Sequence, residues 1–200
     1  MNRIIALLAA TGATAALVAF SSPAAAQSRE AFTGPRVEVT GGYDTTSIEA
    51  PAAGAPDSVD QARIGGAIGY DIPLGTNWTL GGEVGIGGTF GDGRRFTAGA
   101  SEFEVDQGRD IDASLRLGYK ISDRTLLYAK AGWANSRYTG RVRTGATEIE
   151  ESSDEDGVRL GAGIEQMLTG NIYAKAEYRF TAYGDDVERH QVLAGVGVRF

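Results

Sequence analysis

Eight segments of the chain alternate apolar and polar residues at every second position, and this period constrains the fold more than any other feature. They cover residues 36–43, 62–71, 78–90, 110–120, 127–134, 158–165, 172–181 and 191–200. Successive side chains of a β-strand point to opposite faces, so this period predicts strands that are apolar on one face and polar on the other. No stretch after residue 26 has a helical period. The alternation therefore predicts an all-β fold.

The connections between these segments are short at one end of the strands and long at the other. The short ones are residues 73–77, 122–124 and 169–171, and those at the opposite end are residues 45–60, 91–102, 139–156 and 184–187, of which the last is the shortest. Bacterial transmembrane barrels have this asymmetry, with short periplasmic turns and longer outer loops. The sequence thus predicts an eight-stranded antiparallel up-and-down transmembrane β-barrel over residues 35–200.

The first 26 residues have the three parts of a bacterial export signal. Arg3 provides the basic start, residues 4–20 are apolar or small, and Ala24 and Ala26 form an A-x-A cleavage site before Gln27. A membrane anchor would instead be followed by a charged stop. We therefore expect a cleaved signal peptide at residues 1–26, a periplasmic segment at residues 27–34, and a protein in the outer membrane.

Alternation alone does not say whether the apolar face points outward to lipid or inward to a ligand, as in a soluble lipocalin-type barrel. The export signal and the unequal connections favour lipid. Aromatic residues of the apolar face lie near both ends of the strands: Tyr70, Trp78 and Tyr119 beside the short connections, and Tyr43, Phe90 and Trp133 toward the long ones. Two such belts are typical of the two interfaces of a membrane. We therefore expect the apolar face to contact lipid and the polar face to line the lumen.

This assignment puts charged residues of both signs inside the barrel. They are Glu38, Arg63, Glu83, Asp112, Arg116, Lys130, Arg159, Glu165, Lys175, Glu177, Arg179 and Arg199. A buried charge without a partner is very unfavourable, so we expect these residues to form ion pairs. An eight-stranded barrel is just wide enough for its own side chains to fill. The expected role of this charge network is structural, and the alternative is a gated, low-conductance path for small solutes.

Four stretches of the chain resemble a known family. They are residues 126–133 (LLYAKAGW), 157–165, 176–180 (AEYRF) and 192–200. In order and spacing they are similar to strands of the small OmpA-like or opacity-type outer-membrane β-barrel family. The resemblance implies an eight-stranded barrel, often described as a porin-family or surface-antigen protein, and it does not imply a particular activity. The chain departs from full-length OmpA-type proteins after its last predicted strand, so we expect it to lack their peptidoglycan-binding domain. The resemblance also implies that the terminal aromatic Phe200 is a signal read by the barrel-assembly machinery.

The composition excludes several kinds of chemical site. The chain has no cysteine and a single histidine, His190, which excludes thiolate and multi-histidine metal sites. Its net charge of -7 does not suit nucleic acid. The lipid A deacylases that such barrels resemble use an H-x-S pair on the outer wall, whereas this chain reads His190-Gln191-Val192. We therefore expect no catalysis, no cofactor and no metal site, with His190 as a residue of the barrel rim.

Charged residues in the long connections suggest contacts beyond the membrane. The arginines expected near the outer rim, where they could hold lipid phosphates, are Arg94, Arg95, Arg137, Arg141, Arg143 and Arg189. An acidic run comprises Glu148, Glu150, Glu151, Asp154, Glu155 and Asp156. This run lacks the spacing of an EF-hand, so a solvated loop is expected rather than a cation site. The expected partners are outer-membrane lipid, lipopolysaccharide and the barrel-assembly machinery, and the expected state is a monomer.

Overall fold

The computed structural model of the chain describes residues 31–48, 58–90, 94–98, 101–144, 147–184 and 187–200. The strands of this part are β1 (Gly34–Ile48), β2 (Ser58–Leu74), β3 (Trp78–Phe90), β4 (Arg94–Ala98), β5 (Ser101–Ser122), β6 (Thr125–Thr144), β7 (Thr147–Met167), β8 (Ile172–Tyr183) and β9 (Val187–Arg199). The expected signal peptide and its cleavage site lie outside the described residues and stay predictions. The described part contains no helix that is long and apolar enough to cross a membrane.

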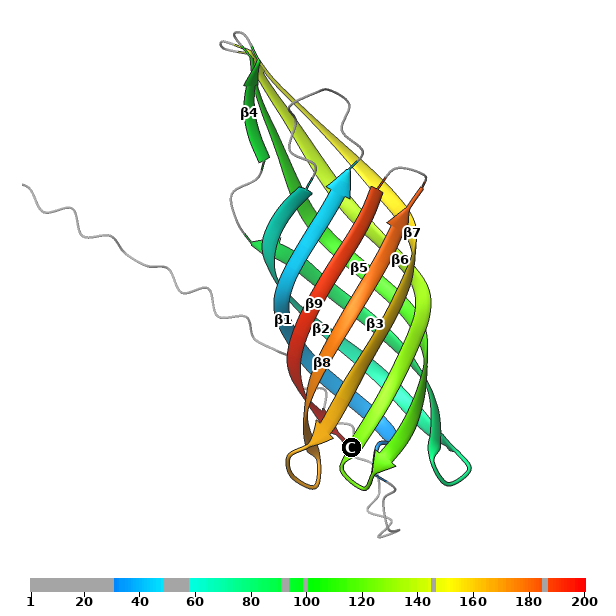
Figure 1. Cartoon of the computed structure of the whole chain (residues 1–200). Coiled ribbons are helices and arrows are strands. Elements are labelled where there is room, and N and C mark those ends of the chain that lie inside the picture. Colours follow the sequence, from blue (N-terminus) through cyan, green and yellow to red (C-terminus); the bar gives the residue numbers. More distant parts are fainter. Residues whose placement is uncertain (1–30, 49–57, 91–93, 99–100, 145–146, 185–186) are drawn as a thin grey trace, which may run out of the picture.

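Eight of these strands close into a ring. The sheet runs in the order β3-β2-β1-β9-β8-β7-β6-β5, and β3 then pairs with β5 from Trp78↔Tyr119 to Gly88↔Arg109. Each pairing is antiparallel, and the strands cross the barrel at a steep tilt (Figure 1). Among the described strands β4 pairs with β5 alone, so it lies outside the ring. The predicted eight-stranded up-and-down barrel is confirmed.

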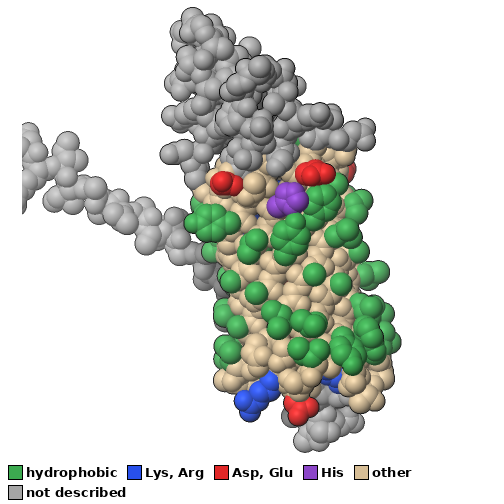
Figure 2. Space-filling view, viewed as in Figure 1, with side chains coloured by type: hydrophobic (Ala, Val, Ile, Leu, Met, Phe, Trp, Pro, Cys, Tyr) green, Lys and Arg blue, Asp and Glu red, His purple; other side chains and the backbone are tan. Residues whose placement is uncertain are grey.

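The two faces of the barrel wall have the polarity that the alternation predicts. Leu115 on β5 is 70% exposed on the outer wall, whereas its neighbours Ser114 and Arg116 are buried inside. The same alternation holds around the ring, and Figure 2 shows apolar side chains spread over the outer surface of the barrel. Water solvates such a surface poorly, and a lipid bilayer solvates it well. The outer wall is therefore the lipid-facing surface.

The connections at the two ends of the ring differ in structure. Short turns join the strands at one end, as expected, but at the other end strands continue where long loops were expected. β5, β6 and β7 continue past the ring and, together with β4, form a sheet that projects beyond the end opposite to the short turns and the C-terminus (Figure 1). Pairing continues out to Ala98↔Ser101 and Thr144↔Thr147. The expectation of long loops is therefore wrong for residues 94–98, 101–102, 139–144 and 147–156, which belong to strands. We call β4 with residues 101–107, 137–144 and 147–154 the projecting sheet.

The alternation of apolar and polar residues changes phase where the strands leave the ring. Within the ring, the odd-numbered residues of β6 face outward and are apolar, as at Ala129 and Trp133. Beyond the ring, three of the odd-numbered positions are charged and Thr139 is polar, and the register of the charged ones with β7 is Arg137↔Asp154, Arg141↔Glu150 and Arg143↔Glu148. A register shift in β5 between Gln107 and Asp110 changes its phase as well. This reversal fits a sheet that leaves lipid and enters water, because charged positions then continue the outer face.

Candidate functional site

Charged side chains fill the lumen of the ring. All eight ring strands contribute to this charge network, which contains nine buried cationic and eight buried anionic residues. They occupy three levels along the barrel axis: a periplasmic level near the short turns, a central level, and an outer level below the projecting sheet. Charges removed from water are stable only when they are paired. The distances between the charged groups therefore decide whether the lumen can be closed to water.

The periplasmic level is organised around Arg199. Its Nη1 lies 2.8 Å from Oδ2 of Asp71, and its Nη2 lies 2.7 Å from Oε2 of Glu165. The same two carboxylates serve two other arginines: Arg36 Nε lies 3.0 Å from Asp71 Oδ2, and Arg116 Nη2 lies 2.6 Å from Glu165 Oε1. Three guanidinium groups thus share two carboxylates at this end of the barrel.

The central level is organised around two lysines. Lys130 Nζ lies 2.6 Å from Glu83 Oε1 and 2.9 Å from Glu177 Oε1. Lys175 Nζ lies 2.5 Å from Glu38 Oε1 and 2.8 Å from Glu177 Oε2. Each lysine therefore bridges carboxylates that come from different strands, and Glu177 is shared by both lysines. The level holds the opposite walls of the barrel together.

Two arginines connect the central level to its neighbours. Arg36 Nη2 reaches up to Glu83 Oε2 at 2.8 Å, from the periplasmic level. Arg179 is hydrogen-bonded to Glu177, and its Nη1 lies 3.4 Å from Asp112 Oδ1 in the outer level. The three levels are therefore one connected network, in which the loss of a single charge leaves partners unpaired on more than one strand.

The outer level is organised around Asp110 and Asp44. Arg159 Nη2 lies 3.0 Å from Asp110 Oδ1, and Arg63 Nη1 lies 2.8 Å from Asp110 Oδ2. Arg189 forms hydrogen bonds with both carboxylate oxygens of Asp44. These planar guanidinium groups suit carboxylates because they can donate two parallel hydrogen bonds. They close the lumen immediately below the projecting sheet.

The structure brings together every residue that the alternation placed in the charge network, since all twelve are buried in the lumen. It adds five that sequence reasoning missed: Arg36, Asp44, Asp71, Asp110 and Arg189. Arg36, Asp71 and Asp110 have the inward parity of their predicted segments, so parity alone would have found them. Asp44 and Arg189 lie just beyond the predicted segment ends. Arg189 was expected at the outer rim, and this expectation is wrong because its side chain is fully buried against Asp44.

An apolar cluster covers the periplasmic end of the lumen. Phe32, which precedes β1, is 1% exposed and packs with Leu126, Met167 and Tyr173. Phe32 has a φ of 75°, an uncommon conformation for a residue other than glycine. The guanidinium carbon of Arg199 lies 5.8 Å from the centre of the Phe32 ring, so the cluster lies directly against the charge network. This cluster was not predictable from the sequence, because a single phenylalanine outside a periodic segment carries no pattern.

The charged residues at the base of the projecting sheet pair across strands. Arg137 is bidentate to Asp154, with Nε–Oδ1 and Nη2–Oδ2 distances of 2.9 and 2.8 Å. This hydrogen bonding from Arg137 holds the pKa of Asp154 below its ordinary value. Trp133 Nε1 donates to Asp156 Oδ1 at 3.1 Å. These acidic residues belong to β7, so the expectation of a loop is wrong for them, although they are exposed to solvent as expected.

Several other charged residues expected near the rim have side chains outside the described part of the chain. The side chains of Arg94, Arg95, Arg141, Arg143, Glu148, Glu150 and Glu151 lie outside the described residues. Within the part that is described, no three acidic or histidine side chains group in a way that could hold a metal ion.

His190 lies on the outer wall near the projecting end. Its Nδ1 is 2.7 Å from the hydroxyl of Tyr178, and its Nε2 is 3.9 Å from Oε2 of Glu188. The imidazole therefore contacts a phenol hydroxyl, and not the serine of an H-x-S pair. The position agrees with the rim assignment, and the arrangement offers no positive sign of catalysis.

A closed antiparallel ring with an apolar outer wall and a charged lumen is a transmembrane β-barrel. The chain belongs to the family described as outer membrane protein beta-barrel domain, whose sequence profile matches residues 12–200. It is similar to the 25 kDa outer-membrane immunogenic protein of Brucella ovis, with 34% identity over 48% of this chain and 46% of that protein. It is also similar to the 22 kDa outer membrane protein of Rhizobium leguminosarum, with 32% identity over 42% of this chain and 44% of that protein.

These relatives place the protein in the outer membrane of a Gram-negative cell. The chain spans about half the length of the curated relatives it matches. Two solved barrels share the fold: Ail, the attachment invasion locus protein of Yersinia pestis, and Neisserial surface protein A. Ail has 17% identity and a TM-score of 0.56, covering 84% of this chain and 100% of Ail. Neisserial surface protein A has 18% identity and a TM-score of 0.56, covering 84% of this chain and 98% of that protein.

Proposed function

We propose that the protein is a sealed outer-membrane barrel that anchors the projecting sheet at the cell surface, with a structural and surface-interaction role. The observation that carries the proposal is the filled lumen, in which seventeen charged side chains of the described residues are buried and paired with one another. A water-filled pore would leave such groups hydrated and mobile. Here the Phe32 cluster also closes the periplasmic end.

The proposed partners follow from the surfaces of the barrel. Lipid, including lipopolysaccharide, contacts the apolar outer wall, and the barrel-assembly machinery inserts the chain. The protein acts as a monomer, because the ring closes within one chain and satisfies the backbone hydrogen bonds of its own strands. No catalytic step belongs to this proposal.

A low-conductance pore for small solutes is the alternative, and the polar lining of the whole lumen favours it. Planar-bilayer recording separates the two functions. The sealed barrel predicts no large, stable openings in wild-type protein. Large and stable wild-type openings would establish the pore and defeat the sealed barrel.

A paired variant sharpens this measurement. Arg116→Ser with Glu165→Ser removes opposite charges together, so the lumen is widened without a change in net charge. We expect small openings in this variant. The matched control is Arg137→Ser with Asp154→Ser, an exposed pair outside the ring, which we expect to stay silent.

Surface presentation of the projecting sheet is tested separately, by labelling. The chain has no cysteine, so single cysteines report one site each. Glu155→Cys lies at the base of the projecting sheet, and Asp123→Cys lies in a short turn at the other end. A large polymer-linked maleimide added to intact cells is expected to label only the former. Labelling of Asp123→Cys alone would reverse the orientation.

A further inference from the structure

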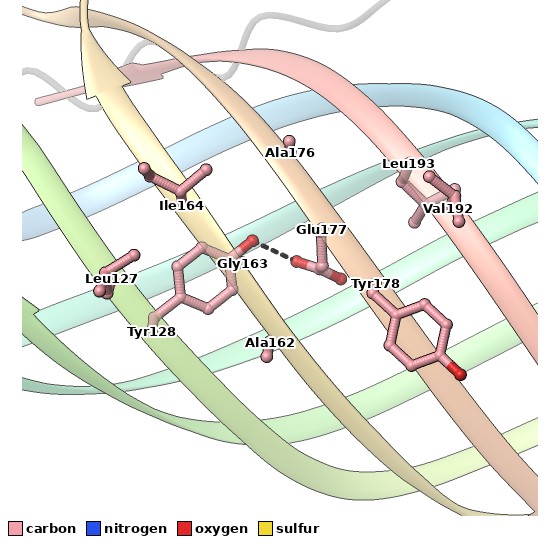
Figure 3. A pocket seen from close by; sticks show the side chains of 10 residues that line it. All are labelled: Leu127, Tyr128, Ala162, Gly163, Ile164, Ala176, Glu177, Tyr178, Val192 and Leu193. Carbon is pink, nitrogen blue, oxygen red and sulfur yellow. Dashed lines mark hydrogen bonds between the residues drawn. The ribbon is translucent and has the colours of Figure 1, made fainter.

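The outer wall of the barrel has a hollow where small residues replace large ones. It occupies about 580 Å³ over β6, β7, β8 and β9 (Figure 3). Its floor is formed by Ala162, Gly163 and Ala176, and the larger side chains at its sides are Leu127, Ile164, Tyr178 and Val192. Large apolar residues cover much of the remaining wall, so this part of the lipid-facing surface is recessed.

Small outward-facing side chains set the depth of the hollow. Ala162 and Ala176 are exposed on the outer wall, whereas Gly163 between Ala162 and Ile164 has inward parity. A Cβ atom at Gly163 would lie 2.5 Å from the buried hydroxyl of Tyr128, which donates to Glu177 Oε2 at 2.5 Å, as the dashed line in Figure 3 shows. The charge network therefore lies directly beneath the hollow, and two alanines form the outer face of its floor.

One end of the hollow is polar. Tyr178 lines the hollow, and its hydroxyl lies 2.7 Å from Nδ1 of His190, whose side chain is 39% exposed on the outer wall. Figure 2 shows the only histidine at the upper border of the apolar surface, next to acidic side chains. A hydroxyl and an imidazole at this height meet the headgroup region of the outer leaflet, where amphipathic rings are favoured.

We propose that this hollow is a binding groove for one acyl chain of an outer-leaflet lipid, whose headgroup lies beside Tyr178 and His190. The groove faces hydrocarbon, so an acyl chain is the chemistry available to fill it. An apolar hollow left unfilled would forfeit the van der Waals contacts of its lining. The polar pair at the outer end sets the direction of the chain, with the headgroup toward the projecting sheet and the tail toward Leu127.

The test measures lipid immobilisation with and without the groove. Wild-type protein is placed in phosphatidylcholine vesicles that contain phosphatidylcholine spin-labelled on one acyl chain. We expect an immobilised component in the spectrum that scales with protein. Ala162→Leu with Ala176→Leu fills the groove and should lower the number of immobilised lipids per protein, although the rest of the outer wall still contacts lipid. The matched control, Ala113→Leu with Ala131→Leu, adds the same atoms to the lipid-facing wall outside the groove and should leave the component unchanged.

Two other results would contradict the proposed groove. Equal immobilisation in wild type, filled variant and control would overturn the groove. Cross-linking that captures dimers of the wild type and loses them in the filled variant would show that a second copy occupies the hollow, which also overturns it. If the filled variant does not fold, Tyr178→Phe removes the polar end alone and should weaken immobilisation, whereas Tyr43→Phe on the same outer face should not. Equal spectra for these two variants would reject the proposal.

Discussion

At the scale of single residues, the position of a charge decides its contribution to stability. Lys130 is buried between Glu83 and Glu177, at 2.6 and 2.9 Å, and removal of its charge would leave carboxylates unpaired out of reach of water. Arg137 pairs with Asp154 over a similar distance, 2.8 Å, but both side chains are almost half exposed. Water and salt screen the exposed pair, so similar distances correspond to very different energies.

Lys130→Met is therefore expected to lower the free energy of unfolding by about 3–5 kcal/mol. Adding Glu83→Gln to Lys130→Met should recover part of the loss, because it removes one of the unpaired carboxylates. Arg137→Met should cost much less, because water and salt screen the exposed pair. Urea unfolding of vesicle-inserted protein, followed by tryptophan fluorescence, measures all three. A loss for Lys130→Met no greater than for Arg137→Met would mean that the lumen is hydrated rather than sealed.

The Arg137–Asp154 pair also predicts a local dependence on pH. The hydrogen bonds from Arg137 hold the pKa of Asp154 below its ordinary value of 3.8, with a smaller contribution from Arg109. A carboxyl with a lowered pKa contributes stability that is present above the ordinary value and is lost as pH falls through the lowered one. The base of the projecting sheet should therefore loosen only below pH 3.8.

Carbon NMR of the Asp154 carboxyl measures this directly. We expect its midpoint to lie below 3.8 in the wild type and to rise toward 3.8 in Arg137→Gln. Arg109→Gln should move it less. A midpoint that Arg137→Gln leaves in place would show that the two side chains do not pair in solution.

At the scale of elements, the ring and the projecting sheet are separate structural units. The ring is closed by β3 and β5 from Trp78↔Tyr119 to Gly88↔Arg109, all of which lies below the projecting sheet. The hairpin of β6 and β7 adds pairs from Arg137↔Asp154 outward to Thr144↔Thr147, and none of these pairs takes part in closing the ring. The ring should thus fold without them.

A shortened hairpin tests this independence. Residues 140–151 are replaced by Asn-Gly, a pair that favours the tight turn between antiparallel strands, so that Thr139 and Ser152 flank the turn. We expect the variant to keep the shift in gel mobility on heating that marks a folded barrel, and to lose only surface-exposed protease fragments. The control deletes residues 79–80 of β3 inside the ring and should abolish the shift. Loss of the shift in the hairpin variant would show that the projecting sheet helps to close the barrel.

The sequence predicts the ring well and the projecting sheet poorly, for one physical reason. Inside lipid, the two faces of a strand meet opposite environments, so alternation is strict, as between Leu115 and Arg116. Beyond lipid, strands depend on cross-strand partners such as Arg137↔Asp154, and sequence spacing does not reveal register. The charge network was largely predictable for the same reason, because inward parity selects its members. The Phe32 cluster and the pairing of particular charges depend on three-dimensional contacts alone.

At the scale of the whole molecule, the barrel is complete only when its first and last strands meet. β1 pairs with β9 from Arg36↔Arg199 to Ile48↔Val187, and the backbone N–H of Phe200 donates to the carbonyl of Pro35 at 2.9 Å. Until this seam forms, two strand edges expose N–H and C=O groups, each of which costs several kcal/mol in hydrocarbon. Phe200 lies at the periplasmic end of the seam with its ring about half exposed, at the interface where aromatic rings are favoured.

We therefore propose Phe200 as an assembly signal, and Phe200→Ala tests it. The variant keeps the length and backbone of the closing strand, so refolding into detergent should be close to wild type. In cells, we expect less folded protein in the outer membrane and more protease-sensitive chain in the periplasm. The control is Leu74→Ala, which also removes an exposed apolar side chain near the short turns but lies on β2, away from the seam. The measurement is the heat-modifiable, protease-resistant fraction in outer membranes at matched expression. Equal fractions for Phe200→Ala and Leu74→Ala would mean that the Phe200 side chain is only one interfacial anchor among several. The assembly machinery would then recognise some other feature of the last strand.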